Sequence, residues 1–287
     1  METFSLSTRT LTLKGISNTQ SAFGAPHDKV VVALHGWQDN AASFTPLMEA
    51  LGPDVPMFAL DWPGHGLSDW RSPDAHYYFI DYVDDLQQVL AKCRAKEIHL
   101  VGHSMGAMVA SLYTACFAEQ INSLTLIEGV GLVCASPEES TELLKRALVQ
   151  RMRAPKLRVY DSAQDLIARR LAVSDFDEAI ATKLMQRNIQ TTAAGVTLRT
   201  DPRIKHYSAF RYSPDQAHAL LADINLPTLL IKGISGYQLV RDNETDFSRH
   251  YNNLRVESVV GGHHCHMENA QLCARLIGAH LHQNGAI

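Results

Sequence analysis

The chain has 287 residues, which is enough for one large hydrophobic core or for one core with a smaller accessory unit. Its formal net charge is only -4 and it has no basic run, so the composition does not favour nucleic-acid binding. No apolar stretch approaches the ~18 residues that a membrane-spanning helix needs, so we expect no membrane span.

The cysteine content and the N-terminal sequence favour a cytoplasmic protein. The five cysteines are scattered, odd in number and without a CxxC pair, which is unusual for a disulfide framework. The first fifteen residues show no basic segment followed by an apolar one, so no secretory signal is expected.

The pattern along the chain predicts an α/β protein. Weak alternation within residues 1–30 indicates a strand or hairpin at a sheet edge. Continuous apolar runs, typical of strands buried on both faces, follow at 30–34, 57–60, 98–101, 124–127, 228–231 and 254–260. Helical spacing is found at 81–95, 106–119 and 268–283. Strands that alternate with helices indicate a mostly parallel, doubly wound sheet.

Residues 132–222 interrupt this alternation. They contain no strand-like run, but they show two helical periods, and Ser174 with Asp177 resembles a capping box at the start of the second. We therefore expect a helical cap over the carboxyl ends of the strands, inserted after the strand that ends at Glu128. The expected α/β core comprises residues 1–131 and 223–287.

A nucleophile motif follows the strand at 98–101. Gly102-His103-Ser104-Met105-Gly106 is a G-x-S-x-G sequence between a strand and a helix, which is the context that gives this motif meaning. The two glycines permit a sharp turn that exposes the serine hydroxyl. Ser104 is the predicted nucleophile.

An acyl-transfer site needs two hydrogen-bond donors directed at the oxygen that becomes negative. The backbone N–H of Met105, directly after the nucleophile, is the first candidate. The second is the backbone N–H of Trp37, in the loop after the strand at 30–34. His35, Gly36 and His103 lie beside these donors in the sequence, and we expect them to line the substrate pocket together with the Trp37 indole.

The general base is expected in the loop after the last strand, because the triad order in this fold is serine, acid, histidine. His263 directly follows the strand and its two glycines, and it is favoured over His264 and His266. These histidines and Cys265 are also metal-ligand types, but adjacent residues rarely converge on one ion, and no metal site is expected.

The acid is less well defined by the sequence. The loop after the strand at 228–231 is one usual place for it, but that loop holds no carboxylate near its turn. Glu128 ends the strand at 124–127, where a buried carboxylate would need a partner such as histidine. Glu128 is the predicted acid, and the alternatives are Asp242, Glu244 and Asp246.

Four segments resemble the α/β-hydrolase superfamily, and within it the serine hydrolase-like (kraken-type) proteins: ALHGWQDNAASF (33–44), LDWPGHGLSD (60–69), LVGHSMG (100–106) and VVGGHHCHMEN (259–269). Residues 198–216 resemble the end of that group's cap. The resemblance implies a serine–acid–histidine hydrolase with a helical cap and no cofactor. Asp61 in the second segment is expected to bond nearby backbone N–H groups.

The leading hypothesis is a serine hydrolase, a carboxylesterase type of enzyme, that cleaves a carboxylic ester or thioester through an acyl-enzyme on Ser104. One alternative is a lyase, perhydrolase or C–C hydrolase that uses the same site, and another is a non-catalytic binding protein. The expected partner is a small acyl ester or thioester, and the expected state is a monomer or homodimer.

Overall fold

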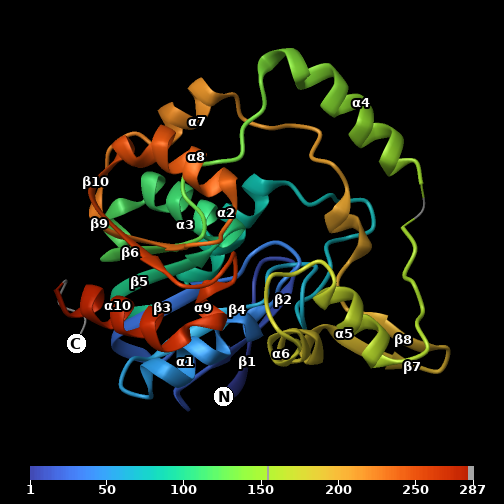
Figure 1. The fold of residues 1–287 in the computed structure, drawn as a ribbon, viewed down its shortest axis with the longest axis horizontal. Coiled ribbons are helices and arrows are strands. Elements are labelled where there is room, and N and C mark those ends of the chain that lie inside the picture. Colours follow the sequence, from blue (N-terminus) through green and yellow to red (C-terminus); the bar gives the residue numbers. More distant parts are fainter. Residues whose placement is uncertain (154, 284–287) are drawn as a thin grey trace.

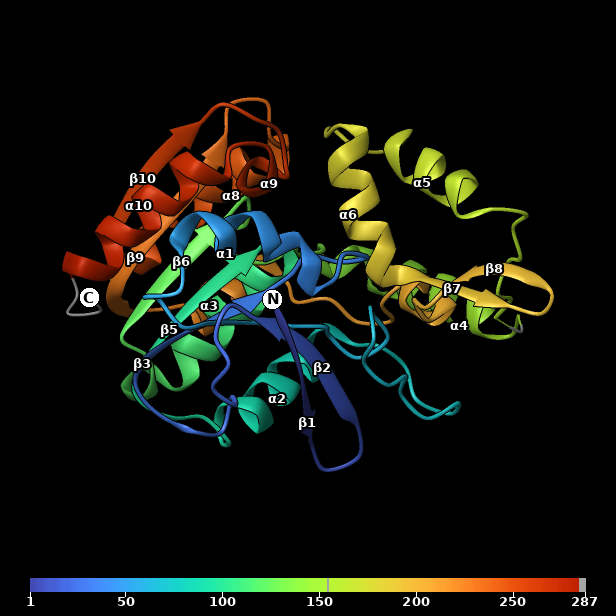
Figure 2. The same cartoon turned by 90° about the horizontal axis from the view of Figure 1, so that it is seen from below.

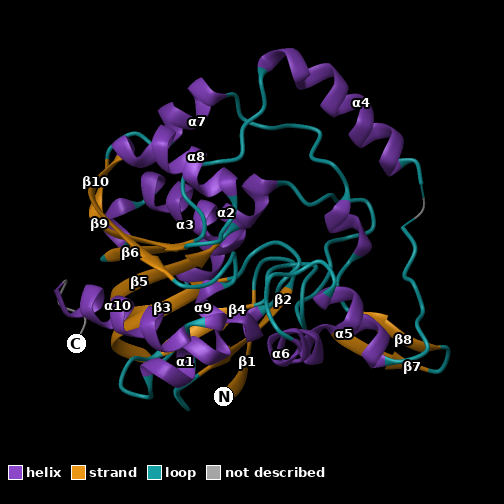
Figure 3. Cartoon of the chain, viewed as in Figure 1, coloured by secondary structure: helices purple, strands orange, loops and turns teal. Residues whose placement is uncertain are grey.

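The centre of the computed structural model, which describes residues 1–153 and 155–283, is an eight-stranded sheet (Figures 1 and 3). The spatial order of its strands is β1-β2-β4-β3-β5-β6-β9-β10. β1 and β2 form an antiparallel hairpin at one edge, β2 pairs with β4 antiparallel, and the remaining neighbours are parallel. The strands are β1 (Glu2–Ser7), β2 (Thr12–Ser17), β3 (Pro26–Leu34), β4 (Met57–Leu60), β5 (Arg94–His103), β6 (Ser123–Ile127), β9 (Ile224–Gly233) and β10 (Tyr251–Val259).

Helices cover both faces of this sheet, because successive side chains of a buried strand point to opposite faces. Val30, Val32 and Leu34 of β3 pack with one hydrophobic cluster, and Val31 and Ala33 pack with the other. The first cluster includes residues of α2 (Phe79–Leu90), α3 (Met105–Cys116) and α8 (Gln238–Phe247). The second includes residues of α1 (Thr45–Leu51), α9 (Cys265–Glu268) and α10 (Ala270–Gln283), which lie below the sheet in Figure 1. The predicted doubly wound α/β fold is therefore confirmed.

The ends of several elements differ from the sequence prediction. The helix expected at 81–95 is α2, which ends at Leu90, and the chain enters β5 at Arg94. The helix expected at 268–283 is divided at Asn269 into α9 and α10. Helices α1 and α8 were not anticipated. Short 3-10 turns are η1 (Ala41–Phe44), η2 (Ala118–Gln120), η3 (Pro137–Glu139), η4 (Pro202–Lys205) and η5 (Ser248–His250).

The segment between β6 and β9, residues 132–222, is here called the cap segment. It contains α4 (Ser140–Arg151), α5 (Ala163–Leu171), α6 (Glu178–Asn188), β7 (Ile189–Thr192), β8 (Gly195–Leu198) and α7 (Pro214–Leu220). β7 and β8 form an antiparallel hairpin, so the expectation of a segment without strands was wrong. The hairpin is short, and its residues lack the continuous apolar run that marks the strands of the large sheet.

The expected capping box was also wrong in detail. Asp177, not Ser174, caps α6, and its Oδ1 accepts a hydrogen bond from the backbone N–H of Ile180 at 2.9 Å. The Ser174 hydroxyl instead donates to the carbonyl of Arg170, in the last turn of α5, at 2.8 Å. Ser174 thus stabilises the end of one helix, and Asp177 the beginning of the next.

The cap segment has a hydrophobic cluster of its own and lies beside the sheet in Figure 2. Leu166, Phe176 and Leu184 belong to this cluster, and Met267 of α9 joins it from the core. The division into a core (1–131 and 223–287) and a cap remains a prediction, and within those ranges residue 154 and residues 284–287 lie outside the described part. No helix in the described ranges combines the length and apolar character needed to cross a bilayer.

Candidate active site

Ser104 sits on a tight turn between β5 and α3. Its φ is 51° and its ψ is -118°, a backbone conformation that side-chain-bearing residues rarely adopt. A Cβ at Gly102 would lie 2.5 Å from the backbone nitrogen of Ala107, and one at Gly106 would lie 2.0 Å from the carbonyl oxygen of Leu34. Both glycines are therefore required by the close approach of neighbouring backbone. The turn places Ser104 at the start of α3, as the motif predicts.

Glu128 directly follows β6, and its carboxylate is buried, with 2% of the residue exposed. Its Oε1 accepts a hydrogen bond from the backbone N–H of Gly233 at 2.7 Å, and its Oε2 accepts one from Tyr237 at 3.2 Å. Oε2 also lies 3.2 Å from Nδ1 of His263. The loop after β9, which carries no acid of its own, thus supplies the donors that hold the Glu128 carboxylate in place.

His263 lies between β10 and α9, with 6% of its surface exposed. Its ring stacks on the Tyr237 ring, with the centroids 4.0 Å apart and the planes at 14°. Its carbonyl oxygen is 2.8 Å from Nε2 of His103, the residue before Ser104. Because Nδ1 faces Glu128, the remaining ring nitrogen, Nε2, is the one available for proton exchange with a hydroxyl group.

The alternative acids and bases lie elsewhere. Asp242 accepts a hydrogen bond from Gln238 within α8, Glu244 pairs with Lys232, and Asp246 is exposed. His266 is fully buried against Phe44 and His103, and neither of its ring nitrogens has a hydrogen-bond partner in the described chain. Of the predicted candidates, the structure brings together Glu128 and His263.

The loop after β3 approaches the Ser104 turn. A Cβ at Gly36 would lie 3.1 Å from Cβ of Ser104 and 3.0 Å from Nδ1 of His103. Within residues 1–153 and 155–283, the backbone N–H groups of Trp37 and Met105 donate to no acceptor. The Trp37 side chain is half exposed, and its indole N–H donates to the carbonyl of Ile204 in the cap segment at 3.1 Å. The two predicted oxyanion donors are thus unengaged, whereas the indole contacts the cap segment.

Two of the three predicted pocket residues lie behind the site. His35 and His103 are completely buried, and burial lowers the pKa of each imidazole to about 4. His35 Nε2 accepts a hydrogen bond from the backbone N–H of Trp62 at 3.0 Å. Both histidines are therefore neutral and hold loops together, whereas Gly36 lies against the Ser104 turn.

A second ionisable cluster, missed by the sequence reasoning, surrounds His264. Its Nε2 lies 3.2 Å from Asp39 Oδ2, and its Nδ1 lies 3.1 Å from Asp175 Oδ1. Arg170 of α5 donates to Asp39 Oδ1 at 2.7 Å. Burial alone would disfavour the imidazolium, but Asp39 and Asp175 outweigh it and raise the pKa of His264 to about 9. A charged His264 therefore joins the cap segment to the loops after β3 and β10.

Asp39, His103 and His264 also form a group of metal-ligand types whose ligand atoms lie within 4.8 Å of one another. The surroundings do not favour a metal ion. Arg170 Nη2 lies 3.5 Å from His264 Nε2, and both nitrogens of His264 face carboxylates. A guanidinium at this distance repels a cation, and the paired carboxylates favour a proton on each nitrogen.

Asp61, after β4, links the same edge of the core to the cap segment. Its carboxylate accepts hydrogen bonds from the backbone N–H groups of Ala41 and Leu67, each at 2.8 Å, in line with the role expected for it. It also forms an ion pair of 2.8 Å with Arg187 of α6, and both side chains are largely buried. Two arginines of the cap segment, Arg170 and Arg187, thus contact acidic residues of the core.

Comparisons with known proteins agree with this architecture. The family model described as the alpha/beta hydrolase fold matches residues 29–270. The chain is 29% identical to serine hydrolase-like protein 2 of Homo sapiens, over 91% of this chain and 89% of the relative. It is 25% identical to the serine hydrolase-like protein of Danio rerio, over 89% and 82%. A hypothetical protein of Pseudomonas aeruginosa PAO1, known from its crystal structure, is 29% identical with a TM-score of 0.87, covering 97% of this chain and 98% of that one. The two serine hydrolase-like relatives support hydrolase activity, and the chain belongs to the α/β-hydrolase fold family.

Proposed function

We propose that the protein is a serine hydrolase that cleaves a carboxylic ester or thioester through an acyl-enzyme on Ser104. The observation that carries this proposal is the buried pair of Glu128 and His263, 3.2 Å apart, beside the turn that holds Ser104. Serine is a weak nucleophile at neutral pH, so it needs a base that is itself oriented by a third group. The names of the serine hydrolase-like relatives support the hypothesis of a hydrolase.

The proposed reaction has two steps, acylation of Ser104 and hydrolysis of the acyl-enzyme. The Ser104 hydroxyl oxygen attacks the acyl carbon while its proton passes to Nε2 of His263, and Glu128 stabilises the resulting imidazolium. The backbone N–H groups of Met105 and Trp37 donate to the oxyanion of the tetrahedral intermediate. The bond to the alcohol or thiol breaks, and the leaving group takes the proton from His263. Water then attacks the acyl-enzyme with His263 again as base, releasing the carboxylic acid and free Ser104.

The pairing around Glu128 supports its assignment as the acid. A carboxylate in this position costs free energy unless it is hydrogen bonded, and here two backbone N–H groups and the imidazole provide those bonds. The proposed substrate is a small acyl ester or thioester, and the protein is proposed to act as a monomer or homodimer without a cofactor.

A labelling and turnover experiment tests the proposal. A fluorophosphonate probe should label the wild type and fail to label Ser104→Ala, and only the wild type should hydrolyse a panel of esters and thioesters of increasing acyl length. Ser21→Ala, at an exposed position, is the matched control and should behave like the wild type. Folded wild-type protein that resists the probe would contradict a nucleophilic Ser104. Labelling without hydrolysis of any panel member would instead favour a lyase or C–C hydrolase.

A further inference from the structure

The backbone of His263, the proposed base, is bonded on both sides by residues from outside its own loop. Its N–H donates to Oδ2 of Asp175, which lies in the cap segment between α5 and α6. Its carbonyl oxygen lies 2.8 Å from Nε2 of His103, the residue before Ser104. The backbone at His263 is therefore fixed by the cap segment on one side and by the nucleophile turn on the other.

The Asp175 carboxylate is itself held in one orientation. Its other oxygen, Oδ1, lies 3.1 Å from Nδ1 of His264, whose Nε2 lies 3.2 Å from Asp39 Oδ2. Asp39 also accepts a hydrogen bond of 2.7 Å from Arg170, in the last turn of α5. With Oδ1 engaged in this way, Oδ2 of Asp175 is directed at the backbone N–H of His263.

The bond between Asp175 and His263 does more than satisfy a backbone donor. The Asp175 side chain is 31% exposed, so water would be able to accept the His263 N–H in its absence. A carboxylate held by an ion pair differs from water because it is a stronger acceptor and it keeps a fixed position. The main effect of the bond is therefore on where the His263 backbone lies.

The position of this backbone determines where the His263 imidazole lies. The ring must keep Nδ1 close to Glu128 Oε2, now 3.2 Å away, while Nε2 exchanges a proton with Ser104. Small displacements of a catalytic group are costly. Glu128 and the stacked ring of Tyr237 restrain the imidazole from core segments, whereas Asp175 restrains the same residue from the cap segment.

We propose that Asp175 is a positioning residue for the proposed base: its carboxylate holds the His263 backbone so that the imidazole lies between Glu128 and Ser104. This inference rests on the proposed hydrolase function. It adds that full activity requires the cap segment to be docked on the core, because a residue of the cap aligns the base. Asp175 acts only through His263 and takes no part in the bond-breaking steps.

Nuclear magnetic resonance on Ser104→Ala protein tests the position of the base without any turnover. The proton on His263 Nδ1 that faces Glu128 should give a signal downfield of the backbone amides. Its absence in Ser104→Ala/His263→Ala identifies it. Adding Asp175→Ala to Ser104→Ala should shift this signal upfield or broaden it, because the imidazole is no longer held against the carboxylate of Glu128.

Steady-state kinetics with the Ser104-containing enzyme provide the second measurement. Asp175→Ala should lower kcat by about tenfold or more and change KM by less than about twofold, because the base is misaligned while the substrate pocket is retained. Asp175→Asn should recover most of kcat, since its amide oxygen can accept the same backbone N–H. A role in stability alone would not produce this separation of kcat from KM.

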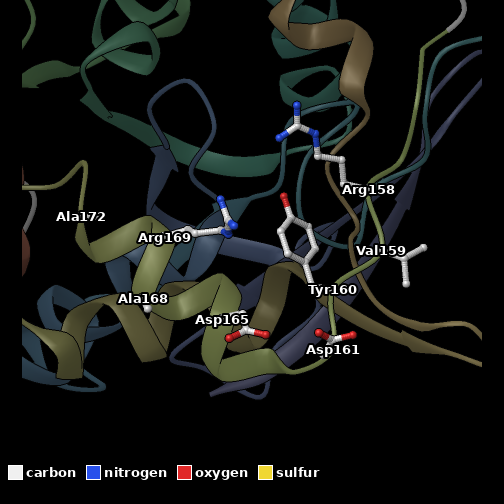
Figure 4. Close-up of a pocket in the computed structure, with 8 residues that line it drawn as sticks. All are labelled: Arg158, Val159, Tyr160, Asp161, Asp165, Ala168, Arg169 and Ala172. Carbon is white, nitrogen blue, oxygen red and sulfur yellow. The ribbon is translucent and has the colours of Figure 1, made fainter.

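Asp177→Ala and Asp165→Ala are the matched controls, and both should keep the wild-type signal and kcat. Asp177 caps α6 two residues after Asp175, so its replacement destabilises the cap segment without removing a bond to His263. Asp165 lines the open pocket beside α5 (Figure 4), and within the described chain its carboxylate bonds no group of the loop after β10. An equal loss of kcat in Asp177→Ala and Asp175→Ala would overturn the inference.

Gly262→Ala tests the same bond if Asp175→Ala does not fold. A Cβ at Gly262 would lie 2.0 Å from Asp175 Oδ2, so it should displace the carboxylate, alter the His263 signal and lower kcat. An unchanged signal and kcat in Asp175→Ala, or in Gly262→Ala, would overturn the inference and leave the hydrolase proposal standing. A signal altered by both variants, without ester turnover by the wild type, would instead support the positioning of His263 and refute the hydrolase proposal.

Discussion

Asp175 of the cap segment and His264 of the loop after β10 form an ion pair, with Asp175 Oδ1 3.1 Å from His264 Nδ1. The other oxygen of the same carboxylate accepts the backbone N–H of His263, the proposed base. The cap segment is therefore bonded to two consecutive residues of this loop. A Cβ at Gly262 would lie 2.0 Å from Asp175 Oδ2, so a glycine is needed for the carboxylate to approach so closely.

The first prediction concerns the pH dependence of stability. The folded-state pKa of His264 is raised to about 9 from an ordinary value of 6.5. A raised pKa means that the folded state binds the proton more tightly, so this stabilisation is complete below pH 6.5 and is lost as pH rises toward 9. Between pH 6.5 and 8.5, the free energy of unfolding of the wild type, measured by urea denaturation, should fall by about 2 kcal/mol relative to that of His264→Gln.

Other groups around His264 also titrate, so the wild type is compared with His264→Gln. The pKa values of the buried His35, His103 and His266 are lowered, so the unfolded state loses their protons near pH 6.5 and stability rises with pH in the same window. This contribution cancels in the comparison, and the lowered pKa values of Asp39 and Asp175 place the titration of their carboxylates on the acid side. The exposed control His282→Gln should follow the wild type. An equal pH dependence in the wild type and His264→Gln would show that His264 is not responsible.

The parts of this site that the sequence predicts are those fixed by local chain geometry. Gly102 and Gly106 reveal the turn around Ser104, because only glycine fits against the adjacent backbone there. Glu128 stands out as a carboxylate at the end of an apolar strand. The parallel sheet then brings the ends of β5, β6 and β10 to one edge, so triad order and strand order together indicate the Glu128–His263 pair.

The His264 cluster could not be predicted in the same way. Asp39, Arg170, Asp175 and His264 come from segments far apart in sequence, and their pairing depends on how the cap segment packs against the core. The one feature of the sequence that pointed to this cluster was the pair of consecutive histidines at 263–264. The sequence alone does not indicate which residues His264 contacts. The β7–β8 hairpin was missed for a similar reason, because strands of four largely exposed residues lack a burial pattern.

The second prediction concerns the acid. Glu128→Gln keeps the side-chain shape but replaces the carboxylate that faces His263 Nδ1 with a neutral amide. The imidazolium would lose its counter-charge and the imidazole its preferred tautomer, so kcat should fall by roughly 10²–10⁴-fold with little change in KM. Steady-state kinetics on a chromogenic ester measure this change.

Asp242→Asn is the matched control for the acid, because Asp242 is an alternative candidate that bonds Gln238 at the surface of α8. It should retain wild-type kcat. If Asp242→Asn were inactive and Glu128→Gln remained active, Asp242 would be the acid and Glu128 would not. Labelling by the fluorophosphonate probe should slow in Glu128→Gln as well, because the same base activates Ser104 in that reaction.

The third prediction concerns the ion pair between Arg187 and Asp61. Arg187→Met removes the cation and leaves a buried carboxylate with only its two backbone donors. Removing one partner of a buried ion pair typically costs about 3–5 kcal/mol, so we expect a decrease of this size in the free energy of unfolding. The double variant Asp61→Asn/Arg187→Met should recover part of this loss, since no buried charge remains. Additive losses in the double variant would argue against direct coupling of the two side chains.

The fourth prediction uses a glycine to move the Glu128 carboxylate without changing its charge. A Cβ at Gly236 would lie 2.3 Å from both Glu128 oxygens, whereas a Cβ at Gly278 in α10 would meet no atom within 4 Å. Gly236→Ala should therefore displace the carboxylate from His263 and lower kcat by about tenfold or more, because small shifts of catalytic groups are costly. Gly278→Ala should leave kcat unchanged and stabilise the protein by up to about 1 kcal/mol, since alanine favours a helix more than glycine does. If Gly236→Ala retained wild-type kcat and its usual pH profile, the position of the Glu128 carboxylate would not matter for turnover. The assignment of Glu128 as the acid would then fail, even if Glu128→Gln were inactive through loss of folding.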